Sequence, residues 1–216
     1  MRRRFRLVGG IMGNAMETPN KSQEKIHQLK FAELAPEVWE VLGTIERSGW
    51  VKRGVKNPET VRDHTESLLQ LACTLEGLSE DEKDGLLEML EIHDWPEAIH
   101  GDEIARAEDP EERKKQKALK FENEHKALEI ICSGLGETGP IILDLWMRFE
   151  KLEDSAAQFA RQLDKFQAVQ KALEYEKTQG LPIFKEFYDG DVGKITHPVL
   201  VRGMGKLMEE WLELKK

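Results

Sequence analysis

The run IHDWPEAIHGDEI (92–104) concentrates side chains that can bind a metal ion or transfer a proton. Imidazoles and carboxylates close together suit a borderline divalent cation, which can activate water for hydrolysis. A solvated acidic helix face would carry the same residue types, so the run alone leaves both interpretations open. The residues concerned are His93, Asp94, Glu97, His100, Asp102 and Glu103.

Two polar residues elsewhere lie on the apolar faces of expected helices. His64 lies between apolar residues three positions before it and four after it, and therefore turns inward with them. Asp164 shares a face with small alanines, and a buried ionised carboxylate is costly unless it is paired or coordinated. A single inward histidine is usually an ordinary core residue. Together with His93 and Asp94, however, these residues could converge on one divalent cation.

Helical periodicity dominates the sequence, and strand-like alternation is scarce. Ser79 with Glu82 forms a capping-box signature, while Pro36 and Pro58 stand near expected helix starts and Gly49 ends the first helix. The expected fold is a single all-α domain. Its helices are expected over 34–48, 58–77, 79–94, 110–132, 140–152 and 155–177, with shorter helical pieces around 183–188 and 200–214.

The composition limits the possible functions. The 216 residues are 39% apolar and carry a net charge of −9, which argues against binding a nucleic-acid polymer. No apolar run approaches the roughly 20 residues that cross a membrane, so we expect a cytoplasmic protein. Cys73 and Cys132 are expected to be buried reduced thiols. Residues 1–28 are expected to form a flexible arm, with a transit peptide or an early start codon as open alternatives.

Three segments carry a resemblance to a known family. RSGWVKRGVKNPETVRDHT, IHDWPEAIHGDEI and QLDKFQAVQKALEYE resemble the HD-domain superfamily of metal-dependent phosphohydrolases, and within it the 5'-deoxynucleotidase group of YfbR-like and HDDC2-like proteins. The resemblance covers roughly 34–180 and implies an HD-domain helical bundle within 29–216, with 181–216 as a C-terminal helical extension. It implies four metal ligands, namely His64, His93, Asp94 and Asp164.

The same resemblance implies roles for two acidic residues. Glu97 would be the catalytic carboxylate beside the attacking water, and its spacing from His93 and Asp94 places it on their face if the helix continues. Without the family, a favourable carboxylate in a first helical turn explains Glu97 about equally well. Asp102 would be a second acidic residue lining the site, although a residue after Gly101 can also be an ordinary helix cap.

Residues 47–62 form a basic segment in an otherwise acidic chain, with five basic residues against Glu59. A basic lip beside a metal would attract a phosphate monoester. The resemblance places Arg47 and Trp50 at the substrate, although Trp50 could instead merely pack over the loop. An arginine fork at Arg53 also suits phosphate oxygens. A charged run at 109–126 is instead interpreted as a solvated helix with i,i+4 pairs.

The sequence thus predicts a phosphohydrolase acting on (deoxy)nucleoside 5'-monophosphates, small molecules, with one divalent ion as cofactor. Mn²⁺, Co²⁺, Fe²⁺ and Zn²⁺ suit the donor set, and Mg²⁺ suits it less. We also expect a homodimer. Two alternatives stay open: hydrolysis of a cyclic nucleotide or guanosine polyphosphate, and a non-catalytic regulatory module that binds nucleotide. Glu97 and Asp102 argue against the last, because binding alone does not need them.

Overall fold

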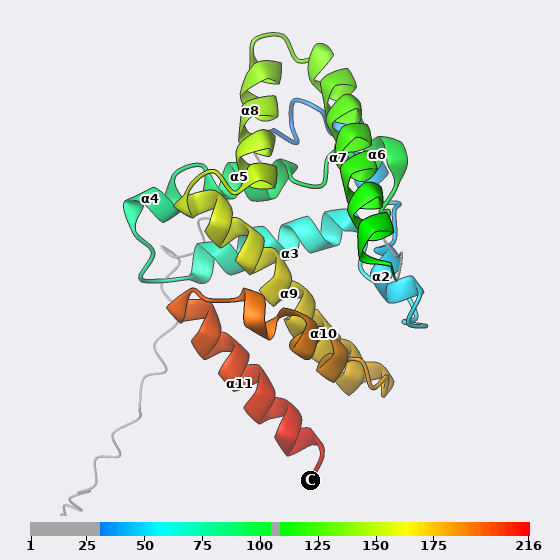
Figure 1. Ribbon diagram of the computed structural model, residues 1–216, viewed down its shortest axis with the longest axis vertical. Coiled ribbons are helices and arrows are strands. Elements are labelled where there is room, and N and C mark those ends of the chain that lie inside the picture. Colours follow the sequence, from blue (N-terminus) through cyan, green and yellow to red (C-terminus); the bar gives the residue numbers. More distant parts are fainter. Residues whose placement is uncertain (1–30, 105–108) are drawn as a thin grey trace, which may run out of the picture.

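The computed structural model describes residues 31–104 and 109–216, so the expected arm at 1–28 lies outside the described residues. Within the described part the chain is helical, and strand-like pairing is limited to one isolated bridge between Glu46 and Thr60 (Figure 1). The predicted all-α fold is confirmed. The helices are α1 (Pro36–Leu42), α2 (Ser48–Val51), α3 (Val61–Thr74), α4 (Glu80–Lys83), α5 (Leu86–Ile92), α6 (Glu97–His100), α7 (Pro110–Ser133), α8 (Thr138–Lys151), α9 (Ser155–Gln179), α10 (Phe184–Asp191), the 3₁₀ turn η1 (Val192–Lys194) and α11 (Pro198–Leu214).

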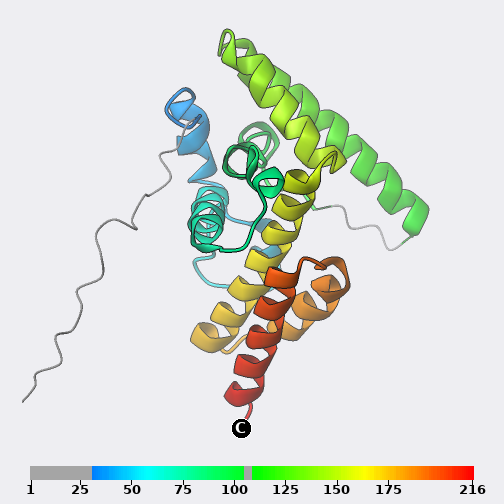
Figure 2. The same cartoon turned by 90° about the vertical axis from the view of Figure 1, so that its left-hand side faces the viewer.

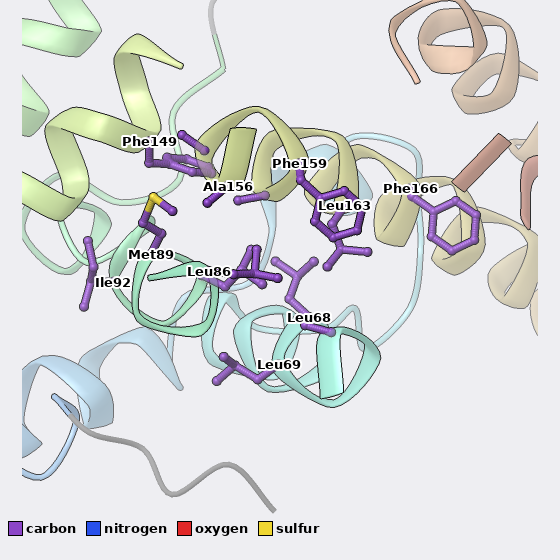
Figure 3. Close-up of a cluster of buried hydrophobic side chains, with 14 of the residues drawn as sticks. Leu68, Leu69, Leu86, Met89, Ile92, Phe149, Ala156, Phe159, Leu163 and Phe166 are labelled. Atoms are coloured by element: carbon purple, nitrogen blue, oxygen red, sulfur yellow. The ribbon is translucent and has the colours of Figure 1, made fainter. Parts of the chain in front are cut away.

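The long helix α9 organises the fold. It packs against α3, α5 and α8 on one side and against α10 and α11 on the other, and both ribbon views show it crossing the middle of the molecule (Figures 1 and 2). The core fills the space between these helices. Figure 3 shows leucines of α3 and α5 meeting Phe159 and Leu163 of α9. Because α3, α5 and α9 share one core, inward residues of all three can meet.

Two helices expected to be continuous are each divided. The expected helix at 34–48 stops at Leu42, and a new one starts at Ser48. Between them the chain pairs with the segment before α3, where the Arg47 amide donates to the Glu59 carbonyl at 3.1 Å. The expected helix at 79–94 divides at Gly85, which has a left-handed φ of 72°. The predicted capping box of Ser79 and Glu82 is confirmed at the start of α4.

The two cysteines differ in their surroundings, and both are free. Cys132 is buried, and burial raises the pKa of its thiol to about 11. The expectation that Cys73 is also buried was wrong. Its neighbour Ala72 turns to the core, and the helical rotation of about 100° per residue sends Cys73 outward.

Across the helices that the structure describes, none has the length and apolar character to cross a membrane.

The hairpin of α7 and α8 depends on the absence of a side chain at Gly139. A Cβ atom built there would lie 2.4 Å from the carbonyl oxygen of Cys132, which is backbone and cannot swing away. We therefore predict that Gly139→Ala lowers the free energy of unfolding by about 1–3 kcal/mol through overpacking. Urea denaturation measures this change.

Gly134→Ala is the matched control, since a Cβ atom there makes only an ordinary contact at 3.8 Å and the backbone is helical. If both alanine variants unfold at the same urea concentration as the unaltered protein, the close approach of α7 and α8 at Gly139 is not tight.

Candidate functional site

The four predicted metal ligands come together from three parts of the chain. His64 lies within α3, His93 directly follows α5 with Asp94 next to it, and Asp164 lies within α9. The Oδ2 atom of Asp94 is 3.1 Å from Nε2 of His93 and 3.9 Å from Nε2 of His64. On the other side, Oδ1 of Asp164 is 3.2 Å from the same nitrogen of His64. His64, His93 and Asp94 each offer a ligand atom, and these atoms lie within 4.8 Å of one another.

The two imidazoles turn the same nitrogen toward the carboxylates. Nδ1 of His93 lies 2.7 Å from the carbonyl oxygen of Leu90, which can only accept, so the ring proton is on Nδ1. Nδ1 of His64 lies 2.9 Å from Oε1 of Gln167. Both Nε2 atoms are buried and make no hydrogen bond within the described part of the chain. Lone pairs that face carboxylate oxygens repel them, and a cation between them removes that repulsion. The donor set fits a divalent ion with imidazole and carboxylate ligands.

Arg47 provides a fixed positive charge at this cluster. Its guanidinium donates to Oδ2 of Asp94 at 2.7 Å. Burial opposes the charge of Arg47, but Asp94, Glu97 and Asp164 outweigh it and raise the arginine pKa. Burial likewise opposes ionisation of Asp94 and Asp164, yet the positive charge that the imidazoles carry when they are protonated, together with that of Arg47, holds the pKa of both carboxyls below its usual range. The two predicted carboxylate ligands, Asp94 and Asp164, are therefore ionised at neutral pH.

Glu97 begins α6 and is almost fully buried, with 3% of its surface exposed. Burial and the nearby charge of Asp94 raise its pKa well above the usual range for glutamic acid. Its Oε2 atom makes no hydrogen bond to any residue in the described ranges. A carboxyl group with a raised pKa and a free oxygen is suited to take up and release a proton during catalysis.

Asp102 ties the loop after α6 to the start of α2. Its Oδ2 atom accepts a hydrogen bond from the Ser48 amide at 2.6 Å. Because Ser48 follows Arg47, this bond fixes the segment that carries the arginine. This contact is compatible with a positioning role, and the role of Asp102 at the site stays a prediction. His100, in the same run, is exposed.

The other two predicted substrate residues make contacts within the protein. Trp50 is 3% exposed, donates to Oε1 of Glu59 at 2.9 Å and stacks on Phe187 with ring centroids 4.5 Å apart. Arg53 pairs with Glu186, and its guanidinium lies over the Phe187 ring at 4.6 Å. Of the three residues, Arg47 is the one that contacts a predicted ligand. Substrate contacts of Trp50 and Arg53 stay predictions.

Lys120 of α7 is a site residue that the sequence analysis missed, because it lies in the run interpreted as solvated. Its Nζ atom is 3.9 Å from Oε1 of Glu97 and 3.2 Å from Oε1 of Glu124, and it donates to the carbonyl of Glu103 at 2.7 Å. Burial, chiefly, raises the pKa of Glu124 to about 7. The spacing of Lys120 and Glu124 from buried Leu128 was the available signal, since steps of four continue the inner face of α7.

Comparisons with known proteins show the family to which this fold belongs. A family described as HD domain matches residues 39–203. The 5'-deoxynucleotidase HDDC2 of Homo sapiens is 32% identical over 172 residues, which cover 78% of this chain and 80% of that protein. The protein of the same name from Xenopus laevis is 31% identical over 173 residues, with 78% and 82% covered.

Solved structures show the same fold. The PH0347 protein from Pyrococcus horikoshii superimposes with a TM-score of 0.59 at 24% identity, covering 84% of this chain and 95% of that chain. The matched family span contains every predicted ligand and Glu97. The predicted resemblance to HD-domain proteins and their 5'-deoxynucleotidase group is confirmed by these matches, and the chain belongs to the HD-domain family.

Proposed function

We propose that this protein is a metal-dependent phosphohydrolase that releases phosphate from (deoxy)nucleoside 5'-monophosphates. The observation that carries the proposal is the pair of buried Nε2 atoms of His64 and His93, which face Asp94 and Asp164 without hydrogen bonds inside the described ranges. The names of the curated relatives, which are 5'-deoxynucleotidases, support the nucleotide as substrate. His64, His93, Asp94 and Asp164 would hold one divalent ion, with Mn²⁺, Co²⁺, Fe²⁺ or Zn²⁺ preferred over Mg²⁺.

The residues around the ligands supply the remaining chemistry. A divalent ion supplies an acidified water and an electrophile for a phosphoryl oxygen. Arg47 binds phosphate oxygens and neutralises the charge that gathers on them. Glu97 takes the proton from the attacking water and can return it to the 5' oxygen of the departing nucleoside, so that no free alkoxide forms. Asp102 holds Arg47 in place through the Ser48 amide.

A panel of substrates tests the proposed reaction. Phosphate release is measured from 5'-monophosphates of ribonucleosides and deoxyribonucleosides, with Mn²⁺, Co²⁺, Fe²⁺, Zn²⁺ or Mg²⁺ supplied in turn. Cyclic nucleotides and a guanosine polyphosphate belong in the same panel. Turnover of 5'-monophosphates with a transition metal supports the proposal. Nucleotide binding without turnover by any metal would instead identify a regulatory module.

The contact between Lys120 and Glu97 leads to a prediction about pH dependence. Burial raises the pKa of Glu97 and the charge of Lys120 opposes this rise, so Lys120→Met raises the pKa of Glu97 further. As a base, Glu97 acts when deprotonated. The acidic limb of the kcat/KM profile therefore moves to higher pH, and kcat/KM at neutral pH falls about 10-fold.

Lys117→Met is the matched control for this variant, because Lys117 lies one turn earlier on α7 and is exposed. An unchanged pH profile for Lys120→Met would mean that the Lys120 charge does not act on the catalytic carboxyl.

We also propose that the protein forms a homodimer and that it is located in the cytoplasm. Exposed apolar side chains on α7 and α8, at Leu119, Ile130 and Ile141, offer a surface for a second copy. Light scattering on the protein as it elutes from a size-exclusion column distinguishes the mass of two chains from that of one.

A further inference from the structure

A chain of buried polar groups leads away from His64 on the side opposite the carboxylates. Oε1 of Gln167 lies 2.9 Å from Nδ1 of His64, and Nε2 of Gln167 donates to Oε2 of Glu59 at 3.1 Å. The other carboxylate oxygen of Glu59 accepts from the indole of Trp50 at 2.9 Å. His64, Gln167, Glu59 and Trp50 all have 6% or less of their surface exposed.

The donor and acceptor groups allow only one direction of donation along these hydrogen bonds. An indole N–H can only donate, and the two side-chain oxygens of Glu59 accept hydrogen bonds from Trp50 on one side and Gln167 on the other. The Gln167 amide must then turn its NH₂ group to Glu59 and its oxygen to His64. An oxygen facing Nδ1 of His64 requires the ring proton on Nδ1. The lone pair of His64 is therefore left on Nε2, the atom beside Asp94 and Asp164.

The ring proton of His64 could instead lie on Nε2. Nε2 of His64 lies 3.2 Å from Oδ1 of Asp164, so a proton on Nε2 would have a carboxylate to bond. That tautomer would cover the nitrogen that a cation needs, and metal binding would have to displace the proton first. A neighbour that holds the proton on Nδ1 removes this competition, as outer hydrogen bonds to metal-binding histidines commonly do.

We propose that Glu59 and Gln167 are positioning residues for the metal centre, which fix the His64 imidazole with its Nε2 lone pair toward Asp94 and Asp164. Trp50 belongs to the same chain, because its indole N–H fixes which oxygen of residue 59 remains for Gln167. The inference rests on the proposed metal dependence and adds the groups that control metal affinity without touching the ion.

The isosteric substitution Glu59→Gln reverses the direction of the hydrogen bonds that run from Trp50 to His64. The Trp50 N–H still requires an oxygen, so the new amide turns its NH₂ group toward Gln167. Gln167 must then accept with its oxygen and present its own NH₂ group to His64. Nδ1 of His64 becomes an acceptor, and its proton moves to Nε2. We expect the affinity for Co²⁺ to fall about 10- to 100-fold, the usual effect of losing an outer partner of a metal ligand.

The exchanged variant Glu59→Gln/Gln167→Glu restores the original direction. The NH₂ group of the new residue at 59 donates to the new carboxylate at 167, and that carboxylate accepts from Nδ1 of His64. We expect Co²⁺ affinity to recover to within about threefold of the unaltered protein, a coupling that independent sites do not show. Glu59→Gln/Gln170→Glu carries the same charge one turn further along α9, at an exposed position, and controls for the charge alone.

Calorimetric titration of the metal-free full-length protein with Co²⁺ measures these affinities, and the visible absorption of bound Co²⁺ reports its ligands. Circular dichroism establishes that each variant is folded. Equal affinity of Glu59→Gln and the unaltered protein overturns the proposal, and so does an exchanged variant no better than Glu59→Gln. If the unaltered protein binds no Co²⁺ while it hydrolyses nucleotides, metal dependence itself is wrong and the proposal falls with it.

Discussion

Asp94→Asn is expected to lower phosphate release by about 1,000-fold or more, because several kcal/mol of metal-derived stabilisation are lost with the ligand. Asp94 is the centre of the site: its Oδ2 atom is within 4 Å of both imidazole Nε2 atoms and accepts from Arg47 at 2.7 Å. Asparagine keeps the size but removes the charge that attracts the cation. An amide nitrogen in the place of Oδ2 would also oppose the Arg47 guanidinium.

Metal content and phosphate release are measured together for this variant. Asp144→Asn on α8 removes a charge at an exposed position and is the matched control. A folded Asp94→Asn protein that keeps its metal and its full activity would remove Asp94 from the ligand set and the proposed centre with it.

Glu97→Gln is expected to separate catalysis from metal binding. Glutamine fills the same buried space but cannot take a proton, so kcat falls about 100- to 10,000-fold, the contribution of a well-placed general acid or base. The four ligands are unchanged, and metal affinity is expected to stay within about threefold of the unaltered protein. Steady-state phosphate release gives kcat, and Co²⁺ titration gives the affinity. Full activity in this variant would show that another group moves the proton.

The same substitution has an expected effect on stability whose sign follows from the raised pKa of Glu97. The folded protein holds the Glu97 proton at pH values where the unfolded chain has released it. Stability of the unaltered metal-free protein therefore falls as pH rises from the ordinary glutamic acid range toward the raised pKa. Glu97→Gln lacks this loss. Its advantage in urea denaturation is expected at neutral pH and to vanish near pH ~4.

The sequence by itself was sufficient for the features that depend on neighbours within one helix. A period of 3.6 residues puts His64 on the face of its apolar neighbours and Asp164 on the face of small ones. The capping box of Ser79 and Glu82 is a contact across three residues. His93 and Asp94, whose side chains can both bind a metal ion, are adjacent in the sequence. Local geometry puts these residues on inward faces, and the packing of α3, α5 and α9 then brings the four predicted ligands close together.

Only the tertiary structure decided the contacts between distant segments. The residues at 34–48 are compatible with one helix, but α1 ends at Leu42 and the segment that follows pairs through Glu46 with Thr60. Trp50 is buried because Phe187, far along the chain, stacks on it. The approach of Lys120 to Glu97 depends on where α7 lies relative to α6. Helical periodicity predicts which face of a helix turns inward. Which groups that face meets is set by the packing of helices remote in sequence, and this packing brings Gln167 to His64.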